Sequence, residues 1–209
     1  MASAPQLLEA WRGGDANAGQ ELVSQYFDSV YRFFVNKAPA AAEDLVQETF
    51  LAVVEGRDKL RDNAALRAYV FAVARRRLYR YWRDRTGKDP QPHTTEDLCG
   101  DATSVCDALA QHQEQKLLLK ALRRLPLPVQ VMLELAYFEG MTDRALADFE
   151  GVALGTLKSR LRKARADLDQ TMASIDGGEL LDSTTLNFDG WVASLRGTMR
   201  ETPAKPLAE

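Results

Sequence analysis

Residues 142–165 read TDRALADFEGVALGTLKSRLRKAR, and this stretch predicts two helices joined by a tight turn. Thr142 is of a type that caps helix N-termini, so a short helix is expected to run from there to Phe149. Gly151 marks the turn, and a longer helix is expected from about Leu154 to Met172. A short capped helix, a turn with one glycine and a longer helix together have the spacing of a helix-turn-helix motif.

The second helix of this motif separates apolar from charged positions. Its apolar stripe consists of Leu157, Leu161, Ala164 and Leu168. Ser159 and five cations face away from that stripe, and no acid interrupts them: Lys158, Arg160, Arg162, Lys163 and Arg165. Thr156 lies near the helix N-terminus, where backbone N–H groups favour a phosphate. The pattern suits a helix that enters a DNA major groove, and the plainer alternative is a basic surface helix.

Helical periodicity extends through most of the remaining sequence. Apolar residues recur at steps of three and four in 16–36, 41–55, 63–84, 105–124 and 128–138. Asp15 is placed to cap the first of these helices, Pro39 to end it, and Gly56 to end the second. No segment alternates with period two, so strands are not expected. The predicted fold class is therefore all-α.

Composition and charge narrow the class of protein. The chain has 209 residues, of which 45% are hydrophobic and 27% charged, and its net charge is −3. It has two cysteines and two histidines, and no apolar run approaches membrane-helix length. We therefore expect a cytoplasmic protein without a disulfide framework, a membrane segment, a signal peptide or a resident cofactor. Two basic blocks, 57–85 and 116–168, predict two surfaces that meet a polyanion.

The first basic block mixes cations with aromatic residues. Its cations include Arg75, Arg76, Arg77, Arg80, Arg83 and Arg85, and the aromatic residues between them are Tyr79, Tyr81 and Trp82. Cations bind backbone phosphates, and aromatic rings stack on bases that are exposed when a strand is unpaired. This mixture favours single-stranded or melted DNA over intact duplex. We assign Tyr81 to packing, whereas Tyr79 and Trp82 remain open between stacking and packing.

Residues 86–104 are rich in Thr, Gly, Pro, Asp and Ser and predict a linker, and 89–115 carry acids but no Lys or Arg. All histidines and cysteines of the chain lie here: His93, Cys99, Cys106 and His112. Four such ligands suggest zinc, but their spacing matches no compact zinc module. We therefore expect no metal site, only thiols and histidines in a linker.

Three stretches resemble the extracytoplasmic-function family of bacterial sigma factors. They are AEDLVQETF (42–50), LRAYVFAVARRRL (66–78) and LPLPVQVMLELAYFEGMTDRALADFEGVALGTLKSRLRKAR (125–165). The resemblance covers roughly residues 5–172 in the family's order. It implies an all-α protein of two small helical domains joined by a flexible acidic linker. The implied ranges are a domain 2-like unit at 1–86, a linker at 87–104, a domain 4-like helix-turn-helix unit at 105–172 and an extension at 173–209.

The resemblance also implies a role for each surface. The first domain would bind core RNA polymerase at the β′ clamp helices through Asp44, Gln47 and Glu48, with further contacts to the β subunit. The following helix would read and melt the −10 element through Arg75, Arg76, Arg77, Tyr79, Arg80, Trp82 and Arg83. The second domain would read the −35 element of promoter DNA through Thr156, Lys158, Ser159, Arg160, Arg162 and Lys163. An anti-sigma factor is a further implied partner.

Two positions depart from that family's pattern in the helix-turn-helix. Glu150 stands where an apolar residue is usual, and Asp143 stands where an aromatic residue is usual. Two other classes of function remain open: a helix-turn-helix regulator that never binds polymerase, and an enzyme that acts on nucleic acid. No paired carboxylates with a histidine, phosphate loop or nucleophile-base pair supports the enzyme.

The extension contains one further helical pattern. Its apolar residues recur at steps of three and four: Phe188, Trp191, Val192, Leu195 and Met199. Asn187 is available as an N-cap for this segment. We expect an amphipathic helix that docks on another surface, because a helix this short is marginally stable alone in water.

Overall fold

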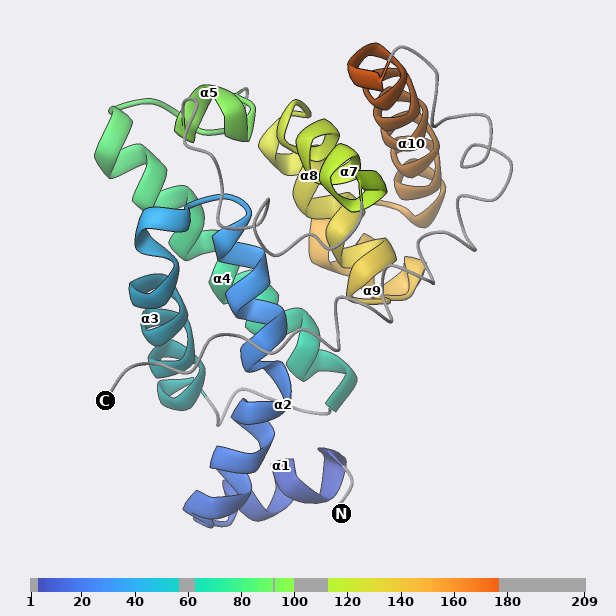
Figure 1. The fold of residues 1–209 in the computed structure, drawn as a ribbon. Helices are drawn as coiled ribbons and strands as arrows, with labels where there is room; N and C mark the ends of the chain where they lie inside the picture. The colour runs from blue at the N-terminus through green and yellow to red at the C-terminus, as the bar shows by residue number, and fades with distance from the viewer. Residues whose placement is uncertain (1–3, 57–62, 92, 100–112, 177–209) are drawn as a thin grey trace.

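A computed structural model describes residues 4–56, 63–91, 93–99 and 113–176, and within these ranges the chain is helical without named strands. Four helices make up the N-terminal unit: α1 (Ala4–Arg12), α2 (Ala16–Val35), α3 (Ala42–Glu55) and α4 (Asn63–Thr86). The C-terminal unit contains α7 (Gln113–Arg123), α8 (Leu127–Leu133), α9 (Asp143–Glu150) and α10 (Leu154–Asp176). The prediction of an all-α fold is confirmed (Figure 1).

The helix ends follow the capping residues that the sequence offers. The Asp15 carboxylate accepts the backbone N–H of Asn17 and of Ala18, and this satisfies donors that the helix itself leaves unpaired. The Thr142 hydroxyl accepts the N–H of Ala145 in the same way. Gly151 ends α9 with a φ of 65°, a left-handed conformation that glycine adopts without strain. These caps fix where the two helices of the helix-turn-helix begin and end.

Aromatic and aliphatic side chains fill the N-terminal unit. The Phe33 ring from α2 meets the Phe71 ring from α4 edge to face, with ring centroids 5.7 Å apart. Phe34, Val30 and Leu78 are completely buried around this pair. Burial of side chains of this size contributes roughly 1.5–3 kcal/mol each before the cost of ordering them. The core therefore fixes the angle at which α4 crosses α2.

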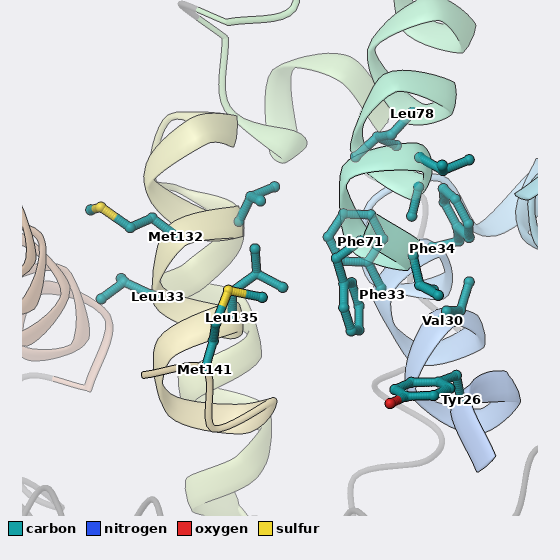
Figure 2. Packing of buried hydrophobic residues seen from close by; sticks show 14 of the residues in the cluster. Tyr26, Val30, Phe33, Phe34, Phe71, Leu78, Met132, Leu133, Leu135 and Met141 are labelled. Carbon is teal, nitrogen blue, oxygen red and sulfur yellow. The ribbon is translucent and has the colours of Figure 1, made fainter. Parts of the chain in front are cut away.

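The buried apolar residues of the two units form one continuous cluster. Figure 2 shows Leu135 and Met141 of the C-terminal unit on the side that faces Phe33 and Phe71 of the N-terminal unit. Helix α9 contacts α4, whereas α10 contacts α7, α8 and α9 and lies on the far side of the C-terminal unit (Figure 1). One basic helix, α4, is thus partly covered by the other unit, whereas α10 packs within its own unit.

The predicted helix at 128–138 has two parts in the structure. After α8 the chain continues as a short π-helical segment, η3 (Glu134–Phe138). The wider π turn is rare and often lies at functional positions. Here it carries Glu134, which is buried, at its first residue. Hydropathy alone does not distinguish this segment from an ordinary helical turn.

The linker contains a helix that the sequence analysis did not predict, α5 (Thr95–Cys99). Thr94 and Asp97 bond reciprocally, each side chain accepting the other's backbone N–H at 3.0 Å, which is a capping box. The buried Thr95 hydroxyl donates to Gln130 on α8, and the Cys99 thiol donates to the Lys37 carbonyl at the end of α2. The described part of the linker is therefore bonded to both units.

Other predictions concern residues outside the described ranges. These include the first part of the helix expected at 105–124, and the amphipathic helix around Trp191. Within the described ranges, no helix combines the length and the apolar character required to cross a bilayer.

Candidate nucleic-acid interface

Helix α3 presents one polar face to solvent. Asp44, Gln47 and Glu48 are all exposed there, while Leu45 and Val46 are buried on the opposite side. The structure thus places the three residues predicted to bind polymerase together on one face. The Glu48 carboxylate pairs with the Arg77 guanidinium on α4 at 3.2 Å, so this face borders the first basic helix.

Two apolar residues extend the same face of α3. Leu51 is 61% exposed and Val54 is 38% exposed, and they follow Gln47 and Glu48 at helical steps of three to seven. The apolar periodicity expected at 41–55 does not distinguish these two residues from the buried ones of the same helix. Their exposure could have been predicted from helical spacing, because Leu51 and Val54 do not fall on the side of the helix that carries Leu45. An exposed apolar edge beside polar residues is typical of a protein-binding surface.

The cations of α4 differ from one another in exposure. Arg76, Arg80 and Arg83 are exposed, whereas Arg75 and Arg77 are half-buried. Arg77 and Arg80 line a groove between α3 and α4 with Tyr81 and Arg85. Arg75 instead turns toward α9 and contacts Phe149 and Glu150. The structure therefore does not bring the predicted −10 residues into one continuous surface.

Trp82 was one of the residues predicted to contact the −10 element, and the structure places it in the core. Its ring is 3% exposed, and its indole N–H donates to the Lys37 carbonyl at 3.2 Å. A base cannot stack on a ring enclosed in this way, so we remove Trp82 from the set of base-contacting residues. Its neighbour Tyr81 packs edge-on against it, as expected for a packing residue.

Tyr79 is half-buried beside the same interface. Burial raises the pKa of its phenol to about 12, which keeps the hydroxyl protonated. Arg75 opposes this shift in pKa, and Glu150 of α9 adds to it. Tyr79 therefore lies where α4 meets the C-terminal unit, and part of its ring remains at the surface.

Helix α10 carries the second basic surface. Of the predicted apolar stripe, Leu157, Ala164 and Leu168 are buried in the core, and Leu161 is partly buried against it. All six residues predicted to contact the −35 element are exposed: Thr156, Lys158, Ser159, Arg160, Arg162 and Lys163. Lys163 pairs within the helix with Asp167 at 2.8 Å, four residues on. An exposed, cation-rich helix after a capped short helix is the geometry that a major groove accepts.

The histidines and cysteines form no metal site in the described part of the chain. No group of three or more metal-binding side chains comes together there, and Cys106 and His112 lie outside the described residues. Burial raises the pKa of the Cys99 thiol to about 11, so the thiol is protonated at neutral pH and donates to the Lys37 carbonyl.

Comparison with known proteins adds to this geometry. Residues 22–87 match the family model for Sigma-70 region 2, and residues 115–168 match that for Sigma-70 region 4. The chain is 32% identical to the ECF RNA polymerase sigma factor RpoE of Cereibacter sphaeroides, over 76% of this chain and 88% of that protein. It is 27% identical to the ECF RNA polymerase sigma factor SigM of Mycobacterium tuberculosis, over 83% of this chain and 86% of that protein.

Solved structures agree at the level of the fold. The sigma factor RpoE of Bartonella quintana, in complex with the anti-sigma factor NepR, is 25% identical with a TM-score of 0.54, and the match covers 74% of this chain and 94% of that one. The structure of CnrH in complex with the cytosolic domain of CnrY is 19% identical with a TM-score of 0.59, and covers 82% of this chain and 99% of that one. With two region matches in order and a relative of this identity and coverage, the chain belongs to the ECF family of RNA polymerase sigma factors.

Proposed function

We propose that this sigma factor docks on core RNA polymerase through the exposed face of α3. Asp44, Gln47 and Glu48 supply the polar contacts to the β′ clamp helices, and Leu51 adds an apolar contact beside them. Their common exposure on one helix face supports this role, because a docking surface needs side chains that reach outward together. The β subunit is the expected second contact.

Promoter recognition is divided between the two units. In the N-terminal unit Arg75, Arg76, Arg77, Tyr79, Arg80 and Arg83 bind the melted −10 element. In the C-terminal unit Ser159, Arg162 and Lys163 contact base edges of the −35 duplex, and Thr156, Lys158 and Arg160 contact its phosphates. The functional domains are 1–86 and 105–172, with a linker at 87–104 and an extension at 173–209, of which residues 173–176 form the end of α10. This assignment rests on the exposed cationic face of α10, on which, within the described part of the chain, only Lys163 of the six predicted residues forms an ion pair, with Asp167.

The protein acts without covalent chemistry, in the cytoplasm where polymerase and promoter meet. An anti-sigma factor is its expected regulator. One similar solved structure, that of RpoE, contains the anti-sigma factor NepR, and another, that of CnrH, contains the cytosolic domain of CnrY. Such a partner would compete with polymerase for the same faces of the two units.

Transcription in vitro tests the proposal directly. The full chain is combined with core polymerase and a pool of promoter sequences, and transcript starts are sequenced. We expect starts downstream of a shared pair of elements, and their loss with Asp44→Ala. The matched control Glu21→Ala removes an exposed acid from α2 and should retain activity. Duplex binding without binding to core polymerase would instead support the regulator that acts alone.

A further inference from the structure

Ion pairs join the two units. Among the described residues, three of these pairs are Lys37 with Glu134, Arg67 with Glu139, and Arg75 with Glu150. In each pair the cation belongs to the N-terminal unit and the carboxylate to the C-terminal unit. Three acids of the C-terminal unit, Glu134, Glu139 and Glu150, therefore lie against cations of the N-terminal unit, which come from the residues after α2 and from α4.

The pair of Lys37 and Glu134 is the most deeply buried of the three. The Lys37 side chain has no solvent exposure, donates to the Phe33 carbonyl at 2.9 Å, and lies 3.9 Å from the Phe33 ring centroid. The Glu134 carboxylate also accepts from Asn36 at 3.0 Å and from Gln130 at 3.1 Å. These bonds compensate for the water that both ions lose when the units close.

The contact on Arg75 involves a residue proposed to bind DNA. Its guanidinium donates to the Glu150 carboxylate at 2.7 Å and to the Phe149 carbonyl at 3.4 Å, and it lies 4.0 Å from the Phe149 ring centroid. A carboxylate, a carbonyl and an aromatic face together resemble what a nucleotide offers: a phosphate, a base oxygen and a ring. All three come from the end of α9, next to the turn of the helix-turn-helix.

We propose that the end of α9 is an internal competitor for nucleic acid. Glu150 and Phe149 occupy Arg75 in the closed protein, and the −10 element binds fully only after the units separate. This inference rests on the proposed DNA-binding role of Arg75. It also gives a physical role to Glu150, which departs from the apolar residue usual at this place in the turn.

The partly exposed ion pairs of the interface favour reversible opening, while the apolar residues shared by the two units oppose it. An ion pair that separates regains the hydration of both ions, so the cost of exposing it is smaller than the pair's contact energy suggests. Added salt screens the partly exposed pairs and favours the open form. Polymerase would draw the units apart by binding surfaces on each of them, and Arg75 would then exchange Glu150 for DNA.

Glu150→Gln in the full chain tests whether Glu150 competes with DNA for Arg75. The substitution retains the size of the side chain and removes its charge. We expect a single-stranded DNA oligonucleotide to bind the protein about three- to fivefold more tightly in the absence of polymerase, which corresponds to a partly exposed ion pair. The matched control is Asp148→Asn, which removes the same charge from α9 at a side chain that pairs only locally with Arg144.

The separation of the units is measured independently of DNA. Spin labels at Gln25→Cys on α2 and Ala173→Cys on α10, in a Cys99→Ser and Cys106→Ser background, report the distance between the units. Both labelled positions are exposed. We expect Glu150→Gln to increase the population at long distances, and the charge swap Arg75→Glu with Glu150→Arg to restore the short distances without restoring tight DNA binding.

The outcomes separate the two claims. If Glu150→Gln and Asp148→Asn give the same DNA affinity and the same label distances, the proposed competition is wrong. If the distances lengthen while DNA affinity is unchanged, Arg75 does not bind DNA and the competitor is again wrong. Failure of the proposed function would appear elsewhere, as loss of promoter-directed transcription by the unmodified chain with core polymerase. A circular dichroism melt of each variant checks that it folds.

Discussion

Helices α4 and α10 are built from similar residues and end in different environments. Both carry clusters of Arg or Lys, and in both an apolar stripe packs into a core. On α10 the cations predicted to read DNA are exposed, and Lys163 pairs with an acid of its own helix. On α4 the acids that pair with Arg67, Arg75 and Arg77 come from other helices or turns.

This difference shows that a basic sequence does not reveal whether its charges are available. The acids that cover α4 lie 75 residues away in the case of Arg75 and Glu150. Only packing of the C-terminal unit against α4 brings them together. We therefore expect substitutions of the α10 cations to change DNA binding alone. Substitutions of the covered α4 cations should also change the contact between the two units.

The largest effect is expected at the buried pair. Glu134→Ala leaves Lys37 buried without its carboxylate, which should lower the free energy of unfolding by about 3–5 kcal/mol. Denaturant unfolding followed by circular dichroism measures this change. The double variant Lys37→Met with Glu134→Leu should recover most of the loss, because it removes both charges. If Glu134→Ala costs less than 1 kcal/mol, the interface between the units is not maintained by this pair.

The next effect concerns α10. Arg162→Ala or Lys163→Ala should reduce discrimination at one −35 position by about 1–3 kcal/mol, because a base contact is lost. Lys158→Ala should weaken binding to all sequences alike and lower the salt slope by roughly one, as expected for a phosphate contact. Binding of holoenzyme to a panel of promoter variants measures both. Equal losses across the panel for Arg162 and Lys163 would contradict their assignment to bases.

A smaller effect is expected at Trp82. Trp82→Phe retains an aromatic ring in the core but removes the N–H that donates to the Lys37 carbonyl. The free energy of unfolding should fall by about 1 kcal/mol for the lost hydrogen bond and further for the space that the smaller ring leaves in the core. Affinity of holoenzyme for a melted −10 strand should not change. A large loss of strand binding would return Trp82 to the set of base-stacking residues.

The smallest effect is expected at an exposed pair within α4. Arg80 and Asp84 are separated by 3.4 Å and are both about two-thirds exposed, at 68% and 66%. Asp84→Asn should change the free energy of unfolding by less than about 0.5 kcal/mol, and salt should reduce even that. Thermal melts at two salt concentrations measure it. A change as large as that of Glu134→Ala would mean that side-chain exposure does not determine how much each ion pair contributes to the free energy of unfolding.

The sequence predicted those local features well that depend only on residues within the same short segment. The cap at Asp15, the cap at Thr142 and the turn at Gly151 each depend on residues within a few positions, and the structure confirms them. The linker helix α5 was missed because five residues give too short a pattern, although the capping pair Thr94 and Asp97 was visible. The π-helical segment η3 leaves no signature in hydropathy.

The candidate sites divide in the same way. The outward face of α3 and that of α10 follow from helical spacing against an apolar stripe, so their residues could be selected from the sequence. Trp82 could not be assigned, because an aromatic residue on a basic helix fits either a core or a stacking platform. Its burial depends on the end of α2, where the Lys37 carbonyl accepts its N–H.

The sequence by itself determined the helix-turn-helix, its caps, the family and the helices other than α1 and α5, because each depends on residues near one another in the chain. Only the tertiary structure decided which cations are covered. Lys37, Arg67 and Arg75 find their acids through packing of two units that are distant in sequence. Periodicity places a side chain on a face of its helix, but the partner that this face meets is set by long-range contacts. The availability of Arg75 to DNA is therefore a property of the assembled units and not of α4 alone.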